Sequence, residues 1–293
     1  MAPTSANIVY IVRHGERLDH VLKMWRPDPA LGIWDPPLSC KGHEQAEQTG
    51  KHILNLMHER GIDVDDATVV FYSSPFQRCI DTAIGVARGM QQTAKTAALR
   101  LELGLGEWMC ERFFDQICPA AQLTSRQHVA LAKQQVSSFN NKGSSSSSGL
   151  PFAVDYGYKQ ARTEFVFPER YSDMLKRFDE TRMHCCAVTT AKLPVAAVRK
   201  HIVVVMVTHA IGISALLDSF RHTLTRPVET SYCSISCVTR CNNMAVFLPS
   251  PTSENGPDDD DTANQDFTSI NQDDGSDMDR WQVELQAFDA HLS

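Results

Sequence analysis

Residues 8–12 read Ile-Val-Tyr-Ile-Val, and residues 13–17 read Arg-His-Gly-Glu-Arg. Five consecutive apolar or β-branched residues are typical of a short strand buried on both faces, and the polar residues begin where such a strand ends. Because ligands bind beyond the carboxyl ends of strands in open α/β sheets, two arginines around a histidine predict a pocket for an anion here. Phosphate is the anion that this pattern favours, and a structural histidine at a strand end is the alternative.

The rest of the chain alternates expected strands with expected helices. Further strands are predicted at 68–72, 98–103, 202–207, 234–239, 245–248 and 281–285, the last of them at a sheet edge. Helices are predicted from the N-cap Ser39 to Gly61, from Pro75 through Val86, from Pro168 to about Cys186 and from Ile211 to about Phe220. The pattern predicts a three-layer α/β/α fold with a mostly parallel central sheet, in which residues 202–207 form a central strand.

We expect one domain over residues 1–293 that carries two insertions. The periodic pattern is lost from about 109 to 168, and residues 140–149 contain a serine-rich run that is typical of a flexible linker. We expect this insertion over the active-site edge of the sheet, in part ordered. Residues 250–279 are mainly Pro, Ser, Asn, Gly and Asp, so a disordered acidic insertion is expected there.

The acidic charge of the chain is concentrated in one segment. The 293 residues carry a formal net charge of −7, and residues 254–279 contain ten acidic residues without Lys or Arg. The other residues hold 25 acidic and 28 basic side chains, a net charge of +3. This near-neutral remainder argues against a nucleic-acid-binding protein with a broad basic face.

The cysteines and the apolar runs indicate the cellular compartment of the protein. Nine cysteines without a Cys-x-x-Cys pair argue against a secreted disulfide framework and a zinc site, and we interpret the spacing of Cys233, Cys237 and Cys241 as packing. No leader-like segment opens the sequence, and no stretch reaches the roughly 18 apolar residues of a membrane span. We therefore expect a cytoplasmic protein with reduced thiols and no membrane partner.

Several polar clusters follow expected strands, and parallel strands bring their carboxyl ends to one edge of a sheet. The clusters are Arg13-His14-Gly15-Glu16-Arg17, Ser73-Ser74-Pro75 with Arg78, Gly104-Leu105-Gly106-Glu107-Trp108 and Val207-Thr208-His209-Ala210. Together they resemble the motifs of the histidine phosphatase superfamily, also called phosphoglycerate mutase-like. The first cluster with Asp19 is similar to the branch of ubiquitin-associated, SH3-containing phosphatases and their steroid-phosphate phosphatase relatives. The resemblance runs from about Ile8 to Phe220.

The resemblance implies a phosphoglycerate mutase-like fold and a phosphomonoester phosphatase that needs no metal or other cofactor. His14 would be the nucleophile that becomes phosphohistidine, and Glu107 would protonate the leaving oxygen and then activate water. His209 would assist both binding and catalysis. The expected substrate is a phosphoprotein or a small phosphate ester, whose phosphate would be bound by Arg13, Arg17, Arg78 and His209.

Other assignments stay open at this point. Glu102 and Glu111 are alternatives to Glu107, because no strand register can be fixed from the sequence. A phosphoglycerate mutase-type transferase is an alternative function, although that branch usually has a small hydroxyl residue at Arg17 and Asn at His20. A non-catalytic phosphate- or partner-binding domain is a third reading. The physiological substrate and the oligomeric state are open, a homodimer included.

Overall fold

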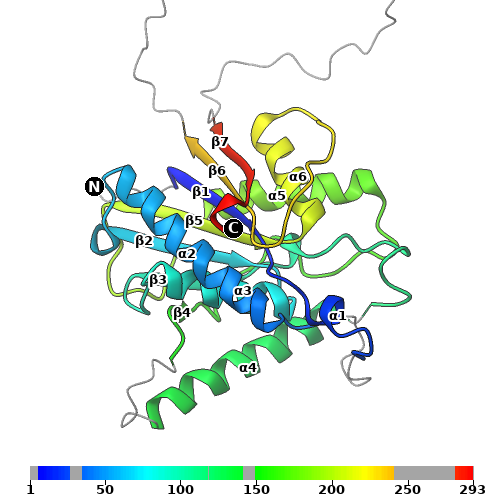
Figure 1. The fold of residues 1–293 in the computed structure, drawn as a ribbon, viewed down its shortest axis with the longest axis horizontal. Coiled ribbons are helices and arrows are strands. Elements are labelled where there is room, and N and C mark those ends of the chain that lie inside the picture. The colour runs from blue at the N-terminus through cyan, green and yellow to red at the C-terminus, as the bar shows by residue number, and fades with distance from the viewer. Residues whose placement is uncertain (1–5, 27–34, 118, 141–148, 241–280, 293) are drawn as a thin grey trace, which may run out of the picture.

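A seven-stranded sheet in the order β4-β3-β2-β5-β1-β6-β7 carries helices on both faces (Figure 1). The computed structural model describes residues 6–26, 35–117, 119–140, 149–240 and 281–292. The strands are β1 (Ile8–Arg13), β2 (Ala67–Ser73), β3 (Ala97–Leu101), β4 (Ala153–Val154), β5 (His201–Thr208), β6 (Ile235–Arg240) and β7 (Trp281–Phe288). The helices are α1 (Leu18–Val21), α2 (Cys40–Glu59), α3 (Gln77–Gly89), α4 (Ala120–Asn140), α5 (Tyr171–Ala187) and α6 (Ala210–Arg221).

The sheet is mostly parallel, as the sequence predicts. Strands β1 to β5 run in one direction, whereas β6 pairs antiparallel with both β1 and β7. Arg13 at the end of β1 is in register with Thr208 at the end of β5, and Ser73 of β2 is in register with Val207. The carboxyl ends of β1, β2 and β5 therefore form one edge, and the segments that follow these strands meet there.

Alternate residues of β1 face two different apolar cores. Tyr10 and Val12 pack in the core beneath α2 and α3, and Val9 and Ile11 pack in the core beneath α5 and α6. All four of these side chains are completely buried. Because both faces of β1 are covered, its sequence is a continuous apolar run rather than an alternating one. β7 lies at the sheet edge, as expected.

Helix α2 follows the sequence prediction at both ends. The hydroxyl of Ser39 accepts a hydrogen bond of 3.0 Å from the backbone N–H of Gly42, which satisfies one free donor of the first turn. Gly61 adopts a positive φ of 69° just beyond the helix, the conformation that glycine tolerates best. Between these ends, Ala46, Ile53 and Met57 form the buried stripe.

The structure corrects several element boundaries. Strand β3 ends at Leu101, and the expected continuation is a 3₁₀ turn, Leu103–Leu105. Helix α3 begins at Gln77, because Pro75 precedes the extended N-cap Phe76. Helix α5 begins at Tyr171 rather than at Pro168, because the N-cap Arg170 is still extended.

Helix α4, which spans 21 residues, was not predicted. Its buried side chains do recur with helical spacing, at Ala120, Leu123, Gln127 and Leu131. However, one of these is a glutamine, and Val129 and Val136 are apolar residues on the exposed face. The apolar residues of this segment therefore do not recur with regular helical spacing, and the sequence pattern does not predict the helix.

Three expectations lie outside the described residues. They are the strand at 245–248, the acidic insertion at 250–279 and most of the serine-rich stretch at 140–149. The antiparallel partners that the structure gives to β6 are β1 and β7.

Candidate active site

The ends of β1 and β5 bring His14 and His209 together. Their ring centroids are 5.3 Å apart, and the backbone N–H of His14 donates a 3.0 Å hydrogen bond to the carbonyl of Thr208. His14 is 2% exposed and His209 is completely buried. Two histidines that lie 195 positions apart in the sequence thus lie side by side, because the two strands that carry them pair in parallel.

His14 is held in a single tautomer. Its Nδ1 atom lies 2.9 Å from the carbonyl oxygen of Gly15, and a carbonyl oxygen can only accept. Nδ1 therefore carries the proton, and Nε2 carries the lone pair. Burial, followed by the positive charge of Arg78, holds the pKa of His14 well below its usual value. The ring is neutral, and Nε2 is available as a nucleophile.

Arg78, near the start of α3, is the cation at the centre of the site. Its side chain is 2% exposed. Nη1 lies 3.4 Å from Oδ1 of Asp35, and Nη2 lies 3.4 Å from Oε2 of Glu107 and 3.1 Å from Nδ1 of His209. Its Nε has no hydrogen-bond partner among the described residues. The guanidinium therefore retains one donor that no described residue occupies.

Glu107 and His209 form a coupled pair. Oε2 of Glu107 lies 3.3 Å from Nδ1 of His209, and the Ser74 hydroxyl lies 2.9 Å from Nε2 of the same ring. Burial raises the pKa of Glu107, but His209 and Arg78 outweigh burial and lower that pKa to about 2. Burial lowers the pKa of His209 to about 4. At neutral pH, the free protein therefore holds Glu107 as a carboxylate and His209 as a neutral ring.

The other two predicted arginines are held by different partners. Arg13 donates from Nη1 to the carbonyl of Thr230, and its guanidinium carbon lies 4.3 Å from the centre of the Tyr232 ring. Burial lowers the pKa of Arg13, which stays far above neutral for a guanidinium. Arg17 makes a two-point contact with Asp19, at 3.0 and 2.7 Å. The structure thus pairs Arg17 with Asp19 in the first turn of α1.

The loop after His14 lies directly against the start of α2. A Cβ atom at Gly15 would lie 2.6 Å from the carbonyl oxygen of Gly42, and a Cβ at Gly42 would lie 2.4 Å from that of Glu16. These neighbours are backbone atoms, which cannot rotate away. Close approach therefore requires glycine at both positions, and it fixes the loop to the helix.

Sequence reasoning missed three residues that support the site. Asp35 faces Arg78 and also accepts from the backbone N–H of Gln77 at 3.0 Å. Ser74, which lies in a quoted motif, had been given no role. The Tyr232 ring lies 5.7 Å from that of His14, and its hydroxyl lies 2.6 Å from Nδ1 of His20. Only Ser74 had a sequence signal, since it follows a strand as the other site residues do.

The structure separates Glu107 from the two alternative carboxylates. Glu102 is completely buried, and its oxygens accept from the backbone N–H groups of Gly104 and Ala161 and from the Tyr158 hydroxyl. Glu111 lies exposed in a turn. Glu102 therefore orders the turn that precedes Glu107, and Glu107 is the carboxylate of the three that contacts His209 and Arg78.

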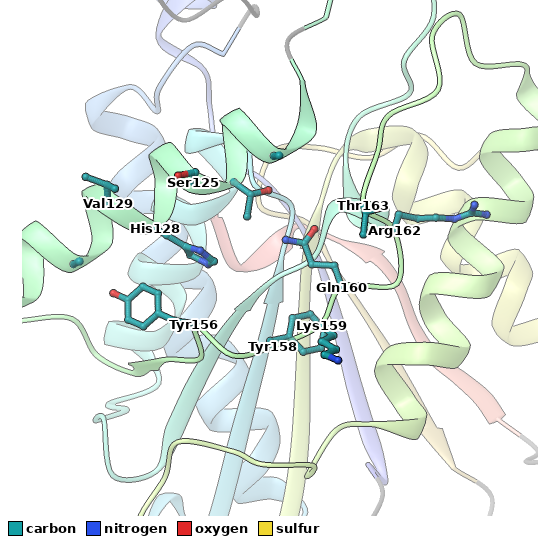
Figure 2. A pocket seen from close by; sticks show the side chains of 12 residues that line it. Ser125, His128, Val129, Tyr156, Tyr158, Lys159, Gln160, Arg162 and Thr163 are labelled. Carbon is teal, nitrogen blue, oxygen red and sulfur yellow. The ribbon is translucent and has the colours of Figure 1, made fainter.

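A separate cavity of about 900 Å³ lies between α4 and residues 156–163 (Figure 2). His128 of α4 meets Tyr156 edge to face there, with ring centroids 5.2 Å apart. None of the six predicted site residues lines this cavity. The expected insertion over the active-site edge thus contains a helix with a cavity of its own.

Three further observations concern the cysteines, the possible metal ligands and the helices of the described residues. Their seven cysteines are free thiols, and Cys233 and Cys237 are buried as packing requires. Within the same residues, no group of three or more His, Cys, Asp or Glu side chains could hold a metal ion. No helix in this part of the chain is long and apolar enough to cross a membrane.

Part of the chain is similar to known proteins. The profile of the histidine phosphatase superfamily (branch 1) matches residues 9–132. Three curated relatives match between a third and two fifths of the chain. The transcription factor tau 55 kDa subunit of Saccharomyces cerevisiae is 33% identical over 103 residues, which are 35% of this chain and 21% of that protein. The ecdysteroid-phosphate phosphatase of Drosophila melanogaster is 30% identical over 126 residues, which are 34% of this chain and 16% of that protein. The ubiquitin-associated and SH3 domain-containing protein A of Mus musculus is 33% identical over 134 residues, which are 37% of this chain and 20% of that protein.

The matched part of the chain thus spans about a fifth of the length of these relatives. A solved structure shares the fold over a longer stretch. The ecdysone phosphate phosphatase of the silkworm, in complex with tungstate, superposes with a TM-score of 0.53 and 19% identity, covering 86% of this chain and 98% of that one. The matching profile and the relatives therefore identify a histidine phosphatase superfamily domain in this chain, with the profile matched over residues 9–132, and the solved structure shows the shared fold.

Proposed function

We propose that the chain is a phosphomonoester phosphatase that forms a phosphohistidine at Nε2 of His14 and needs no metal ion. The observation that carries the proposal is the contact between Nδ1 of His14 and the carbonyl of Gly15, because it leaves Nε2 unprotonated beside Arg78 and His209. The names of relatives such as the ecdysteroid-phosphate phosphatase support the same reaction class. A phosphoprotein or a small phosphate ester is the substrate that we propose.

In the first step, the lone pair of Nε2 attacks phosphorus and the bond from phosphorus to the leaving oxygen breaks. Phosphoryl transfer depends mainly on positioning and on neutralising the equatorial oxygens. Arg78 supports this role because its buried guanidinium retains an unpaired donor, and Arg13 adds a second positive charge at the same edge. These cations supply the charge that a metal ion supplies in other phosphatases.

Glu107 requires a proton before it can donate one to the leaving oxygen. In the free protein its contacts with His209 and Arg78 favour the carboxylate. A bound phosphate dianion would compete for the same partners and would add negative charge nearby, and both effects raise the pKa of a carboxyl group. In the second step Glu107 takes a proton from water as the water oxygen bonds to phosphorus. The bond between phosphorus and Nε2 breaks, its electron pair returns to the ring of His14, and inorganic phosphate leaves.

The test is the release of inorganic phosphate and the corresponding phenol from an aryl phosphate by the purified protein. We expect both products in equal amounts with the wild type and neither with His14→Ala. Transfer of the phosphoryl group to another metabolite without phosphate release would favour the mutase-type alternative.

One comparison favours a second candidate function. A relative with 33% identity is a subunit of a transcription factor, so a phosphate- or partner-binding domain without turnover is the alternative. This alternative would be supported if the purified protein bound inorganic phosphate but hydrolysed no phosphate ester.

We also propose a cytoplasmic location. The free thiols support it, in particular the exposed Cys40, because an exposed thiol persists best in a reducing compartment. Fractionation of cells that express the protein from its own locus tests this proposal.

A further inference from the structure

The C-terminal turn packs against a helix that borders the candidate active site. The turn Ala290–Leu292 follows β7 and contacts α2, where Figure 1 shows the red C-terminal end. The His291 ring stacks on that of His52 from α2, with centroids 5.0 Å apart. Phe288 stacks against both rings, at 5.2 and 5.7 Å. Three stacked rings therefore fasten the turn to α2.

A chain of hydrogen bonds runs from this turn to His14. The Thr49 hydroxyl donates its single proton to the carbonyl of Cys233 at 3.2 Å, so it accepts from Nε2 of His291 at 2.9 Å. The backbone N–H of Cys233 in turn donates to the carbonyl of His14 at 3.3 Å. Three hydrogen bonds thus connect the imidazole of His291 with the backbone of the proposed nucleophile.

The surroundings of His291 favour the neutral ring that this chain requires. Its Nδ1 is buried without a hydrogen-bond partner among the described residues, so a proton there would be a buried, unpaired donor. Burial, together with His52 on α2, lowers the pKa of His291 to about 4, whereas Asp289 on the same turn and a hydrogen bond to the backbone of Cys233 oppose this shift. Nε2 therefore carries the proton at neutral pH and donates to Thr49.

Residues 232–234 form the turn through which these hydrogen bonds reach the site. Cys233 adopts a φ of 55°, a left-handed conformation that is strained for a residue with a side chain. On one side of it, the Tyr232 ring packs on Arg13 and His14. On the other side, the carbonyl of Ser234 accepts from the backbone N–H of Arg13 at 3.2 Å. The 232–234 turn therefore contacts both Arg13 and His14, and the Thr49 hydroxyl donates a hydrogen bond to the carbonyl of Cys233 in this turn.

A cavity of about 540 Å³ supports the same connection. Arg13, Glu16 and Tyr232 line it together with Asp289, Ala290 and Leu292 of the C-terminal turn. The turn thus forms one wall of a cavity whose other wall is the catalytic motif.

We propose that Thr49 and His291 are positioning residues for His14, which act by holding the 232–234 turn. The proposal rests on the proposed function, since it assigns these two residues to the same reaction. Neither residue touches the substrate. Loss of either one lets the 232–234 turn relax from its strained conformation, and the backbone of His14 moves with it.

The central test compares Thr49→Val with Thr49→Ser. Valine keeps the shape of a completely buried side chain and removes the hydroxyl, whereas serine keeps the hydroxyl. With an aryl phosphate, we expect kcat of Thr49→Val to fall about 10-fold at a nearly unchanged KM, because misplacement by about 1 Å can cost as much as about 100-fold. We expect Thr49→Ser to restore most of the wild-type kcat.

A second pair of variants separates the hydrogen bond from the ring stack. His291→Phe keeps an aromatic ring but cannot donate to Thr49, so we expect the loss seen in Thr49→Val. The double variant should be no worse than either single one, because both break the same chain. His52→Phe is the matched control, since it keeps the stack and lies outside the chain of hydrogen bonds, and we expect wild-type kcat.

Binding of orthovanadate, measured by calorimetry, gives a readout that needs no turnover. We expect about 10-fold weaker binding to Thr49→Val, because the anion depends on the same placement of Nε2. Unchanged kcat and unchanged vanadate affinity in Thr49→Val, with only a lower Tm, would overturn the inference. A wild type that binds vanadate but hydrolyses no phosphate ester would instead contradict the proposed function, and the vanadate comparison would then decide the inference.

Discussion

Oε2 of Glu107 lies 3.3 Å from Nδ1 of His209, and this contact holds the carboxylate in its ionised form in the free protein. Glu107, the proposed general acid, is therefore a carboxylate, its conjugate base, before substrate binds. A phosphate dianion that binds to Arg78 and His209 would weaken the contact and raise the pKa of Glu107. Binding of the substrate would thus prepare the acid that the first step needs.

The first prediction concerns the stability of the free protein against acid. The folded pKa of Glu107, about 2, lies below the ordinary value of 4.5. A depressed carboxyl pKa contributes stability that is fully present above the unfolded pKa and is lost as pH falls through the folded one. We therefore expect the free energy of unfolding of the wild type, relative to Glu107→Gln, to increase from about pH 2 to about pH 4.5 and then to level off. Urea unfolding at several pH values measures this, and a constant difference would contradict the assignment.

The second prediction concerns the leaving group. Glu107→Gln should slow an alkyl phosphate by about 10² to 10⁴-fold, because an alkoxide needs a proton to leave. It should slow phosphoryl transfer from p-nitrophenyl phosphate far less, since p-nitrophenolate is stable near neutral pH. The pre-steady state of the variant should then show a burst of p-nitrophenolate followed by slow turnover, because the second step also uses Glu107.

The exposed Glu111 supplies the matched control for this experiment, and Glu111→Gln should behave as the wild type with both substrates. Equal slowing of the burst for both leaving groups in Glu107→Gln would mean that this residue only shapes the pocket.

The third prediction concerns the covalent intermediate. His14→Ala should be folded and inactive, since it removes only the ring that carries Nε2. Rapidly quenched wild type should carry label from a ³²P substrate that is labile to acid and stable to base, the behaviour of a phosphoramidate. Label that alkali removes would indicate a different nucleophile.

The fourth prediction concerns metals and inhibitors. Hydrolysis should survive EDTA, because Arg13 and Arg78 supply the positive charge at the site, and orthovanadate should inhibit it. Activity that EDTA abolishes and Mg²⁺ or Zn²⁺ restores would refute the proposed mechanism.

The sequence predicted the strands and helices that a run of neighbouring residues is enough to specify. The continuous apolar runs of β1 and β5 indicated buried parallel strands, and both are buried. The ends of those strands then located His14 and His209, because a parallel sheet collects its carboxyl ends at one edge. The same logic placed Arg78 near them after β2.

The residues that the sequence did not reveal depend on tertiary contacts. Asp35 and Tyr232 are single polar residues in loops, and no periodic pattern links either of them to Arg78 or His14. Arg17 is predicted to bind phosphate, and the structure adds a two-point contact with Asp19 in the first turn of α1, which no spacing encodes. Helix α4 was hidden because Val129 and Val136 lie on its exposed face.

The backbone contact between Gly15 and Gly42 also determines which substitutions the chain can tolerate. Gly42 belongs to none of the motifs that indicated the site, yet even a methyl group there would push on the carbonyl of Glu16, two positions after the proposed nucleophile. In a library of random variants, position 42 should therefore be as depleted as the motif itself. A glycine in a helix, outside every motif of the site, would then tolerate substitution as poorly as a residue that takes part in the reaction.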